Sequence, residues 1–567
     1  MFDFTKLSLV AGPAAAKAAA LFAEEIALRT QTAPSISEKP LKSGPFVCFE
    51  QDESLENDEF VLKLEEERPS LTIMAEGTRG FIYGYSMFLR KTTYIDGKIT
   101  LITDPSGRYS PDKPIRGHQL GYRPKNNTYD AWTPEHYARY YRDMMAFGSN
   151  MCELMPPLTD DRAVNELMKY PADEMLITCS ALADELDLDV SIWYPNCEES
   201  TVEESAEIRK ELLGRLPRVD VIFPPGGDPG DYPAEEFIER CIAAARKVKE
   251  VHPNVEMWPS AQRPKRIRDW GEKFIKEMEA LPPEINGVIT GPNRAFDIEV
   301  LRRRLPMQYP IRLYPDITHN VRCEWPVHFP RDDWHFAFAA TMGRESINPR
   351  PVEFREVYRM FSRYTCGGVS YSEGSNDDIN KMVWGWMDYA PDTPVVEILE
   401  DYARFFFPGA DAERIAEGIL ALEKNWYGDP AENPLIEATL SHWEAIAAEH
   451  PELMQNWRFV MCLFRARGDA VIRRRRIFEN RLVSKTNKLL KKASTAKAIE
   501  EALDVLNTPH EESYQTLRAS LYDLAQMLFD TIGIQLDVAN FKAAAPDRGA
   551  TLDTIDQPIT DRKYLIT

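Results

Sequence analysis

The stretch GGVSYSEGSNDD, residues 367–378, decides the fold because a short β-like run in it ends in a burst of polar residues. Two glycines open it, residues 369–371 can form a strand, and Glu373, Asn376 and Asp377 follow almost without interruption. A strand that ends in acids predicts a helix cap, a metal site or one half of an acid/base pair. The segments before it decide between these interpretations.

Seven similar runs precede this stretch, and most of them also end in polar or aromatic residues. Helix-like segments lie between the runs, such as HYARYYRDMMAFG (136–148), whose aromatic residues keep helical spacing. Strand-like runs that alternate with helices over about 270 residues predict an α/β fold, a (β/α)8 TIM barrel. An open doubly wound sheet competes, but GHQLGY (117–122) is a poor version of its Gly-rich phosphate turn. The eight runs are 115–122, 150–157, 189–196, 219–228, 254–260, 285–293, 311–320 and 367–377.

A chain of 567 residues is too long for one hydrophobic core, so several domains are expected. The pattern of strand-like and helix-like segments changes twice along the chain. We expect a small N-terminal α/β domain (1–113), the barrel as the catalytic domain (114–394) and an all-helical C-terminal domain (395–567). Amphipathic segments without a strand pattern indicate the last of these. In the first domain, the expected helices are 14–29 and 77–90, and the expected strands are 46–50, 60–64 and 71–75.

Composition excludes several classes of partner. The net charge of −22 argues against nucleic acid, because phosphate binding needs a basic face. The basic run 473–476 is typical of a solvated helix face or of salt bridges between domains. No stretch of about 18 apolar residues occurs, so we expect no membrane span. Eight scattered cysteines indicate reduced thiols, with neither a disulfide framework nor zinc.

The N-terminus lacks a secretory signal, which predicts a cytoplasmic protein, although a secreted or periplasmic chain trimmed of its signal peptide would look the same. We expect no cofactor and no metal. Whether the chain forms a homo-oligomer is left open.

In a TIM barrel the reactive groups collect at the carboxyl ends of the strands. Here those ends offer carboxylates, indoles, phenols and amides, with few basic groups. Aromatic faces suit the apolar faces of sugar rings, and amides and carboxylates match sugar hydroxyls. Glycosidic bond cleavage needs one carboxyl group that stays protonated and one that stays ionised. The strand ends therefore predict a glycoside hydrolase that acts on an oligosaccharide. Such an enzyme would take part in polysaccharide breakdown.

Asp228 and Glu373 are the first candidates for the catalytic acids, and Glu153 and Asp316 follow. Asp228 comes after two glycines, which indicates close backbone approach, although an Asx-turn would also explain it. Glu153 stands in an apolar setting, so it needs either a catalytic role or a buried arginine partner. Asp316 with His319 could alternatively bind a metal.

Further side chains at the strand ends are expected to bind the sugar. For each aromatic residue among them, packing in the core is as good an explanation as contact with a sugar. Asp377 and Asp378 precede a helix-like segment, which favours a capping role for one of them. The predicted substrate-binding residues are His118, Arg123, Trp193, Tyr194, Trp258, Asn293, Arg294, His319, Asn320 and Asn376.

Several motifs resemble those of known glycoside hydrolases. GTRGFIYGYSMFL (77–89) and IRGHQ (115–119) are similar to the helix and first barrel strand that end the α/β domain and open the barrel in β-hexosaminidase-like and α-glucuronidase-like enzymes. GGD (226–228) resembles the GGD-Glu motif of β-hexosaminidases, where the Asp orients the acetamido group and the Glu is the acid, but Pro229 follows here. SYSEGSNDDINKMVW (370–384) resembles the barrel end of α-glucuronidase-related bacterial proteins, which implies a helical C-terminal domain.

Two alternatives remain beside the hydrolase. One is a metal-dependent sugar isomerase or lyase that uses Glu153, Asp316 and His319. The other is a barrel that binds glycans without cleaving them, because one barrel fold hosts many chemistries.

Overall fold

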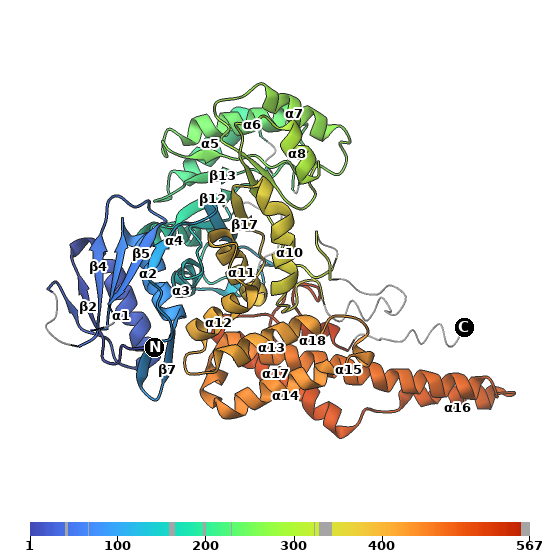
Figure 1. Cartoon of the computed structure of the whole chain (residues 1–567). Coiled ribbons are helices and arrows are strands. Elements are labelled where there is room, and N and C mark those ends of the chain that lie inside the picture. The colour runs from blue at the N-terminus through green and yellow to red at the C-terminus, as the bar shows by residue number, and fades with distance from the viewer. Residues whose placement is uncertain are drawn as a thin grey trace.

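The computed structural model describes residues 1–39, 44–65, 67, 69–157, 165–196, 200–227, 229–321, 324–327 and 343–556. An N-terminal α/β unit, a barrel and a helical region follow one another along the chain (Figure 1). The domain boundaries near residues 113 and 394 stay predictions.

The N-terminal unit is a six-stranded sheet in the order β3-β2-β4-β6-β5-β9, with a separate three-stranded sheet β1-β8-β7. Alternate residues of β4, such as Val47 and Phe49, are buried, as expected for a sheet with one covered face. The three predicted strands are present, and further short strands, too brief for a periodic signal, flank them. The elements are β1 (Phe2–Asp3), β2 (Ser8–Ala11), α1 (Ala16–Thr30), β3 (Ile36–Ser37), β4 (Phe46–Gln51), β5 (Phe60–Glu65), β6 (Ser70–Ala75), α2 (Thr78–Arg90), β7 (Thr92–Ile95), β8 (Lys98–Leu101) and β9 (Gly107–Tyr109).

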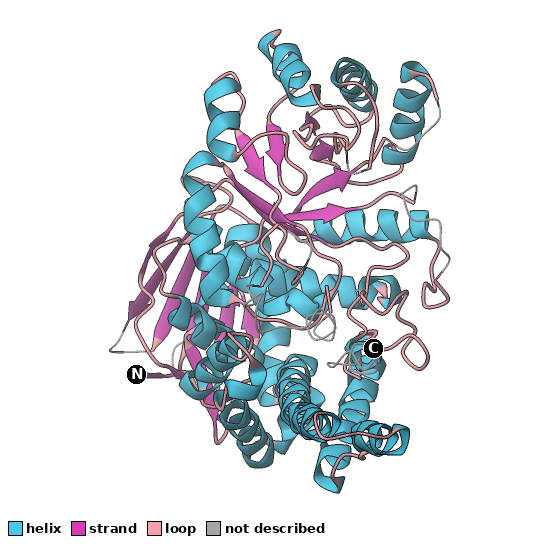
Figure 2. Cartoon of the chain, turned by 90° about the vertical axis from the view of Figure 1, so that its right-hand side faces the viewer, coloured by secondary structure: helices cyan, strands magenta, loops and turns pink. Residues whose placement is uncertain are grey.

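The barrel confirms the predicted fold class. Its eight strands run parallel in the order β14-β13-β12-β11-β10-β17-β16-β15, and bridges Met257–Ile285 and Ser260–Ile289 join the two outer strands. Figure 2 shows the strands curling inside the surrounding helices. Each of the eight predicted runs supplies one strand. The strands are β10 (Ile115–Gln119), β11 (Met151–Leu154), β12 (Asp189–Trp193), β13 (Val221–Phe223), β14 (Glu256–Met257), β15 (Val288–Thr290), β16 (Ile311–Leu313) and β17 (Gly367–Ser370).

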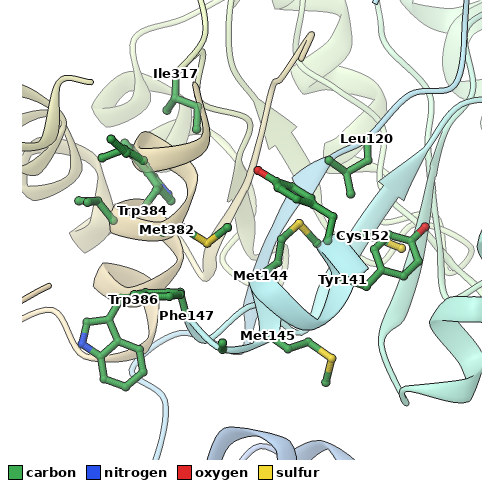
Figure 3. Close-up of a cluster of buried hydrophobic side chains, with 14 of the residues drawn as sticks. Leu120, Tyr141, Met144, Met145, Phe147, Cys152, Ile317, Met382, Trp384 and Trp386 are labelled. Carbon is green, nitrogen blue, oxygen red and sulfur yellow. The ribbon is translucent and has the colours of Figure 1, made fainter. Parts of the chain in front are cut away.

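Both faces of the barrel strands are buried, which is why they appear in the sequence as nearly continuous apolar runs. Figure 3 shows Met144 and Phe147 near the side chains of Met382 and Trp386, so the helical layers outside β10 and β11 pack through large apolar groups. The barrel helices are α3 (Pro134–Met145), α4 (Ala172–Glu185), α5 (Val202–Leu213), α6 (Ala234–Val248), α7 (Trp270–Glu279), α8 (Ile298–Arg304), α10 (Pro351–Phe361) and α11 (Asp378–Tyr389).

The C-terminal region is helical among the described residues, and α15 with α16 projects from the body (Figure 1). Within the basic run 473–476, Arg474 pairs with Glu437 at 2.8 Å and Arg476 with Asp429 at 3.1 Å. These salt bridges join α15 to the segments before it, and so the run serves packing. The helices are α12 (Val395–Phe406), α13 (Ala412–Lys424), α14 (Leu435–Glu449), α15 (Trp457–Leu490), α16 (Ala496–Asp504), α17 (Glu512–Ile532) and α18 (Thr551–Thr554).

The expected capping by Asp377 or Asp378 is wrong. Asp377 stands at the N-cap position of α11, but its side chain caps no backbone N–H and pairs with Lys381 instead. The carboxylate of Asp378 accepts hydrogen bonds from Tyr402 at 2.7 Å and Arg458 at 2.9 Å, which ties the barrel to the helical region. Burying a carboxylate without partners costs more free energy than leaving a helix end uncapped, so these side chains pair with donors instead.

The six cysteines in the described part of the chain carry free thiols, as predicted. No helix among these residues is both long and apolar enough to cross a membrane.

Candidate active site

A cavity of about 580 Å³ lies at the carboxyl ends of the barrel strands. Residues that end or follow each of the eight strands line it, and one residue comes from the C-terminal region. Its size is that of a site for a small ligand. The lining residues are Arg123, Met155, Trp193, Pro229, Gln262, Gly291, Pro292, Asn293, Arg294, Tyr314, Asp316, His319, Glu324, Arg344, Tyr371, Glu373 and Arg548.

Glu373, three residues after β17, is the most densely bonded carboxylate of the cavity. Its side chain is 2% exposed, and it accepts hydrogen bonds from His319 Nε2 at 3.2 Å and Arg123 Nη2 at 3.4 Å. The Tyr371 hydroxyl and Arg548 Nη1 donate to it as well. These donors fix the carboxylate at the strand tip, where the sequence predicted it.

Glu345 lies beside Glu373 and shares its donors. It accepts from His319 Nε2 at 3.2 Å and from Arg548 Nη1 at 2.8 Å. Burial, together with the charge of Glu373, raises the pKa of Glu345 to about 8. Burial also opposes ionisation of Glu373, but hydrogen bonds from His319 and Glu345 hold its pKa well below the ordinary value. The pair therefore carries one proton near neutral pH, on Glu345.

His319 is a further cation beside these carboxylates, in addition to Arg123 and Arg548. Its Nδ1 lies 3.0 Å from Asp316 Oδ2, and its backbone N–H donates to Asp316 Oδ1 at 3.2 Å. Burial opposes the charge, but Asp316 and the two glutamates raise the pKa of His319 well above its ordinary value. An imidazolium donates from both ring nitrogens, and so it links Asp316 to Glu373.

Glu324 is a third acid on the cavity wall, in addition to Asp316 and Glu373. Its side chain is 5% exposed and pairs with Arg294, while its Oε2 has no hydrogen-bond partner among the described residues. Burial raises the pKa of Glu324 to about 8. The negative charge of Asp316 also raises this pKa, whereas the positive charge of Arg294 lowers it. A neutral carboxylic acid therefore lines the same cavity as the ionised Glu373.

Aromatic side chains form part of the wall. The rings of Tyr314 and Tyr371 meet edge to face at 5.6 Å, and the Arg123 guanidinium lies 5.5 Å from the centre of the Trp193 ring. Asn293 has a φ of 58°, a left-handed conformation that asparagine tolerates and that is frequent at functional sites. The cavity thus combines flat apolar surfaces with amide and carboxylate groups.

The structure brings seven of the predicted residues together on the cavity wall. They are Arg123, Trp193, Asn293, Arg294, Asp316, His319 and Glu373. Asp228, the other leading candidate, lies outside the described residues, and its neighbour Pro229 lines the cavity.

The remaining predicted residues are engaged elsewhere. Glu153 pairs inside the barrel with Arg312 at 2.6 Å, both side chains being fully buried, which matches the buried arginine partner considered from the sequence. The two aromatic residues contact charged side chains: the Arg209 guanidinium lies 4.4 Å from the centre of the Tyr194 ring, and Trp258 donates to Glu256 at 2.7 Å. His118 forms a hydrogen bond with Ser370 Oγ at 2.7 Å. Asn320 donates to the Ser346 carbonyl at 3.1 Å, and Asn376 donates to the Glu345 carbonyl.

Four charged residues at or beside the cavity were not predicted from the sequence: Glu324, Arg344, Glu345 and Arg548. Glu324 and Glu345 lie between β16 and α10, outside regular structure, so no periodic pattern marks them. Arg548 lies in the C-terminal tail, and no local signal connects it with the barrel.

His319, Glu345 and Glu373 each offer a potential ligand atom, all within 4.8 Å of one another. Arg548 donates to both carboxylates, and His319 is itself charged, so positive charge already stands among these groups. The described residues arrange the cluster as an ion-pair network of protein groups.

Neither a family model nor a curated protein matches the chain. Among solved structures, a family 89 glycoside hydrolase from Clostridium perfringens is 9% identical with a TM-score of 0.51, over 96% of this chain and 69% of that one. A GH20 exo-β-N-acetylglucosaminidase from Vibrio harveyi is 12% identical with a TM-score of 0.47, over 73% and 75%. The first of these likenesses extends over nearly the whole chain and supports the predicted fold, a barrel with flanking N- and C-terminal regions.

Proposed function

We propose that the chain is a glycoside hydrolase that cleaves a glycosidic bond of an oligosaccharide bound in the barrel cavity. One observation carries the proposal: a single cavity holds a neutral acid, Glu324, and an ionised carboxylate, Glu373. Glycosidic bond cleavage needs carboxyl groups in these two states.

Glu324 is the proposed general acid. With a pKa of about 8 it keeps its proton near neutral pH, and its Oε2 makes no hydrogen bond to another described residue. In the proposed reaction this proton passes to the leaving oxygen of the scissile bond. Arg294, on the other side of the carboxyl group, holds it in place.

Glu373 is the proposed nucleophile or base. Its donors His319, Arg123 and Arg548 orient it and keep it ionised. Negative charge at this position, with Asp316 behind His319, stabilises the positive charge that develops on the sugar ring in the transition state.

The sugar would lie against Trp193, Tyr314 and Tyr371, with hydroxyls within reach of the amides of Gln262 and Asn293. The family 89 structure was solved in complex with PUGNAc, so this compound is the first ligand to test.

The test is a panel of oligosaccharides and aryl glycosides, with product release measured for the wild type, Glu324→Gln and Glu373→Gln. Glu272→Gln is the matched control, because Glu272 is an exposed acid of α7 paired with Arg304. We expect Glu373→Gln to lose hydrolysis of the whole panel, Glu324→Gln to lose hydrolysis of the oligosaccharides, and the control to keep both. Binding of glycans without turnover by the wild type would instead favour the glycan-binding barrel.

A further inference from the structure

After α17 the chain does not leave the molecule but returns to the barrel as the C-terminal segment, residues 533–556. Asn127, in the loop after β10, holds two points of it. Asn127 Oδ1 accepts from the backbone N–H of Gln535 at 3.0 Å, and its Nδ2 donates to the carbonyls of Gln535 at 2.7 Å and Arg548 at 2.8 Å. The segment is thus anchored to the barrel on both sides of its loop.

Gly549 sets the direction of the chain next to Arg548. Its φ is 77°, and a Cβ atom there would lie 2.9 Å from Asn127 Nδ2 and 3.3 Å from the Glu345 carbonyl oxygen. Only glycine fits this left-handed bend and close approach without strain. The bend presents the Arg548 side chain to the cavity, which it lines.

Arg548 Nη1 donates to Glu345 Oε1 at 2.8 Å and also to Glu373 Oε2. The two carboxyl groups are 1% and 2% exposed, whereas the arginine side chain is 20% exposed. One guanidinium nitrogen therefore contacts both carboxyl groups, and hydrogen bonds between a charged donor and a carboxylate are the strong ones.

We propose that Arg548 is a positioning residue that the C-terminal segment supplies to the active site. It holds Glu345 and Glu373 side by side and so fixes the orientation in which Glu373 meets the sugar. The inference rests on the proposed function of Glu373 and goes beyond it, because it makes the C-terminal segment part of the catalytic unit.

Arg548→Met removes the bridge, and Arg548→Lys keeps a positive charge on a shorter side chain that lacks the guanidinium group. Arg518→Met is the control. Arg518 pairs with Asp556 at 3.0 Å, near the end of the same segment, and does not line the cavity. We expect Arg548→Met to lower kcat by about 100-fold, the loss typical of a misplaced catalytic group, with KM little changed. Arg548→Lys should fall between it and the wild type, and Arg518→Met should match the wild type.

Crystal structures of the wild type and of Arg548→Met decide the positioning without any substrate. We expect the carboxyl groups of Glu345 and Glu373 to separate in the variant. Unchanged positions of both groups, or an unchanged kcat, would overturn the proposal. If the wild type hydrolyses no glycoside, the proposed function fails, yet the two crystal structures still show whether Arg548 holds the carboxyl pair.

Discussion

The pH dependence of hydrolysis tests the assignment of Glu324 as general acid. Burial moves the pKa of Glu324 from its ordinary 4.5 to about 8. Roughly nine in ten molecules then carry the proton at about pH 7, and the protonated fraction falls about tenfold per pH unit above the pKa. We therefore expect kcat/KM to be halved at a pH of about 8 and to fall as the pH rises further. Since the pKa of Glu373 lies well below its ordinary value of 4.5, the activity should not fall as the pH drops toward 5.

Glu324→Gln should lower kcat/KM by about 100- to 10,000-fold on natural glycosides, which is the usual contribution of a general acid, and remove the alkaline loss. A nitrophenyl glycoside needs no protonation of its leaving group, so its hydrolysis should fall much less. Arg294→Met should move the alkaline loss to higher pH, because Arg294 opposes the raised pKa of Glu324.

Glu345→Gln is the decisive comparison, because the pKa of Glu345 is also about 8. The assay is the pH profile of kcat/KM for each variant, which reports the ionisation of the free enzyme. If the alkaline loss persists in Glu324→Gln and disappears in Glu345→Gln, Glu324 is not the acid.

Other variants separate structural from catalytic carboxylates. Glu153→Ala removes the carboxylate that pairs with Arg312 at 2.6 Å and leaves a buried guanidinium without that partner. The free energy of unfolding, measured in urea, should fall by about 3–5 kcal/mol. Lost activity at unchanged stability would return Glu153 to the catalytic candidates. Glu373→Gln should abolish turnover but retain ligand binding by calorimetry. Asp228→Asn tests the remaining predicted acid, and wild-type kcat and KM would remove it from the site. Trp193→Ala should raise KM about tenfold through lost stacking, and an unchanged KM would show that the indole does not contact sugar.

The barrel could be predicted because its strands and helices carry strong local signals. Glu373 follows β17 by three residues, so a strand prediction also placed this carboxylate at the rim. The same reasoning included Tyr194 and Trp258, which directly follow β12 and β14 but contact Arg209 and Glu256. Whether a residue at a strand end points into the cavity depends on strand twist and loop path, which no local pattern records.

The sequence by itself determined the order of strands and helices, the barrel and the positions of Asp316, His319 and Glu373 after their strands, because burial and periodicity act over short stretches of chain. Only the tertiary structure decided the electrostatics of the site. Glu345 and Arg548 are 203 residues apart, and Arg548 and Glu373 are 175 apart. Their contact, and the proton that Glu324 keeps, depend on burial and on neighbours that long-range packing alone brings together.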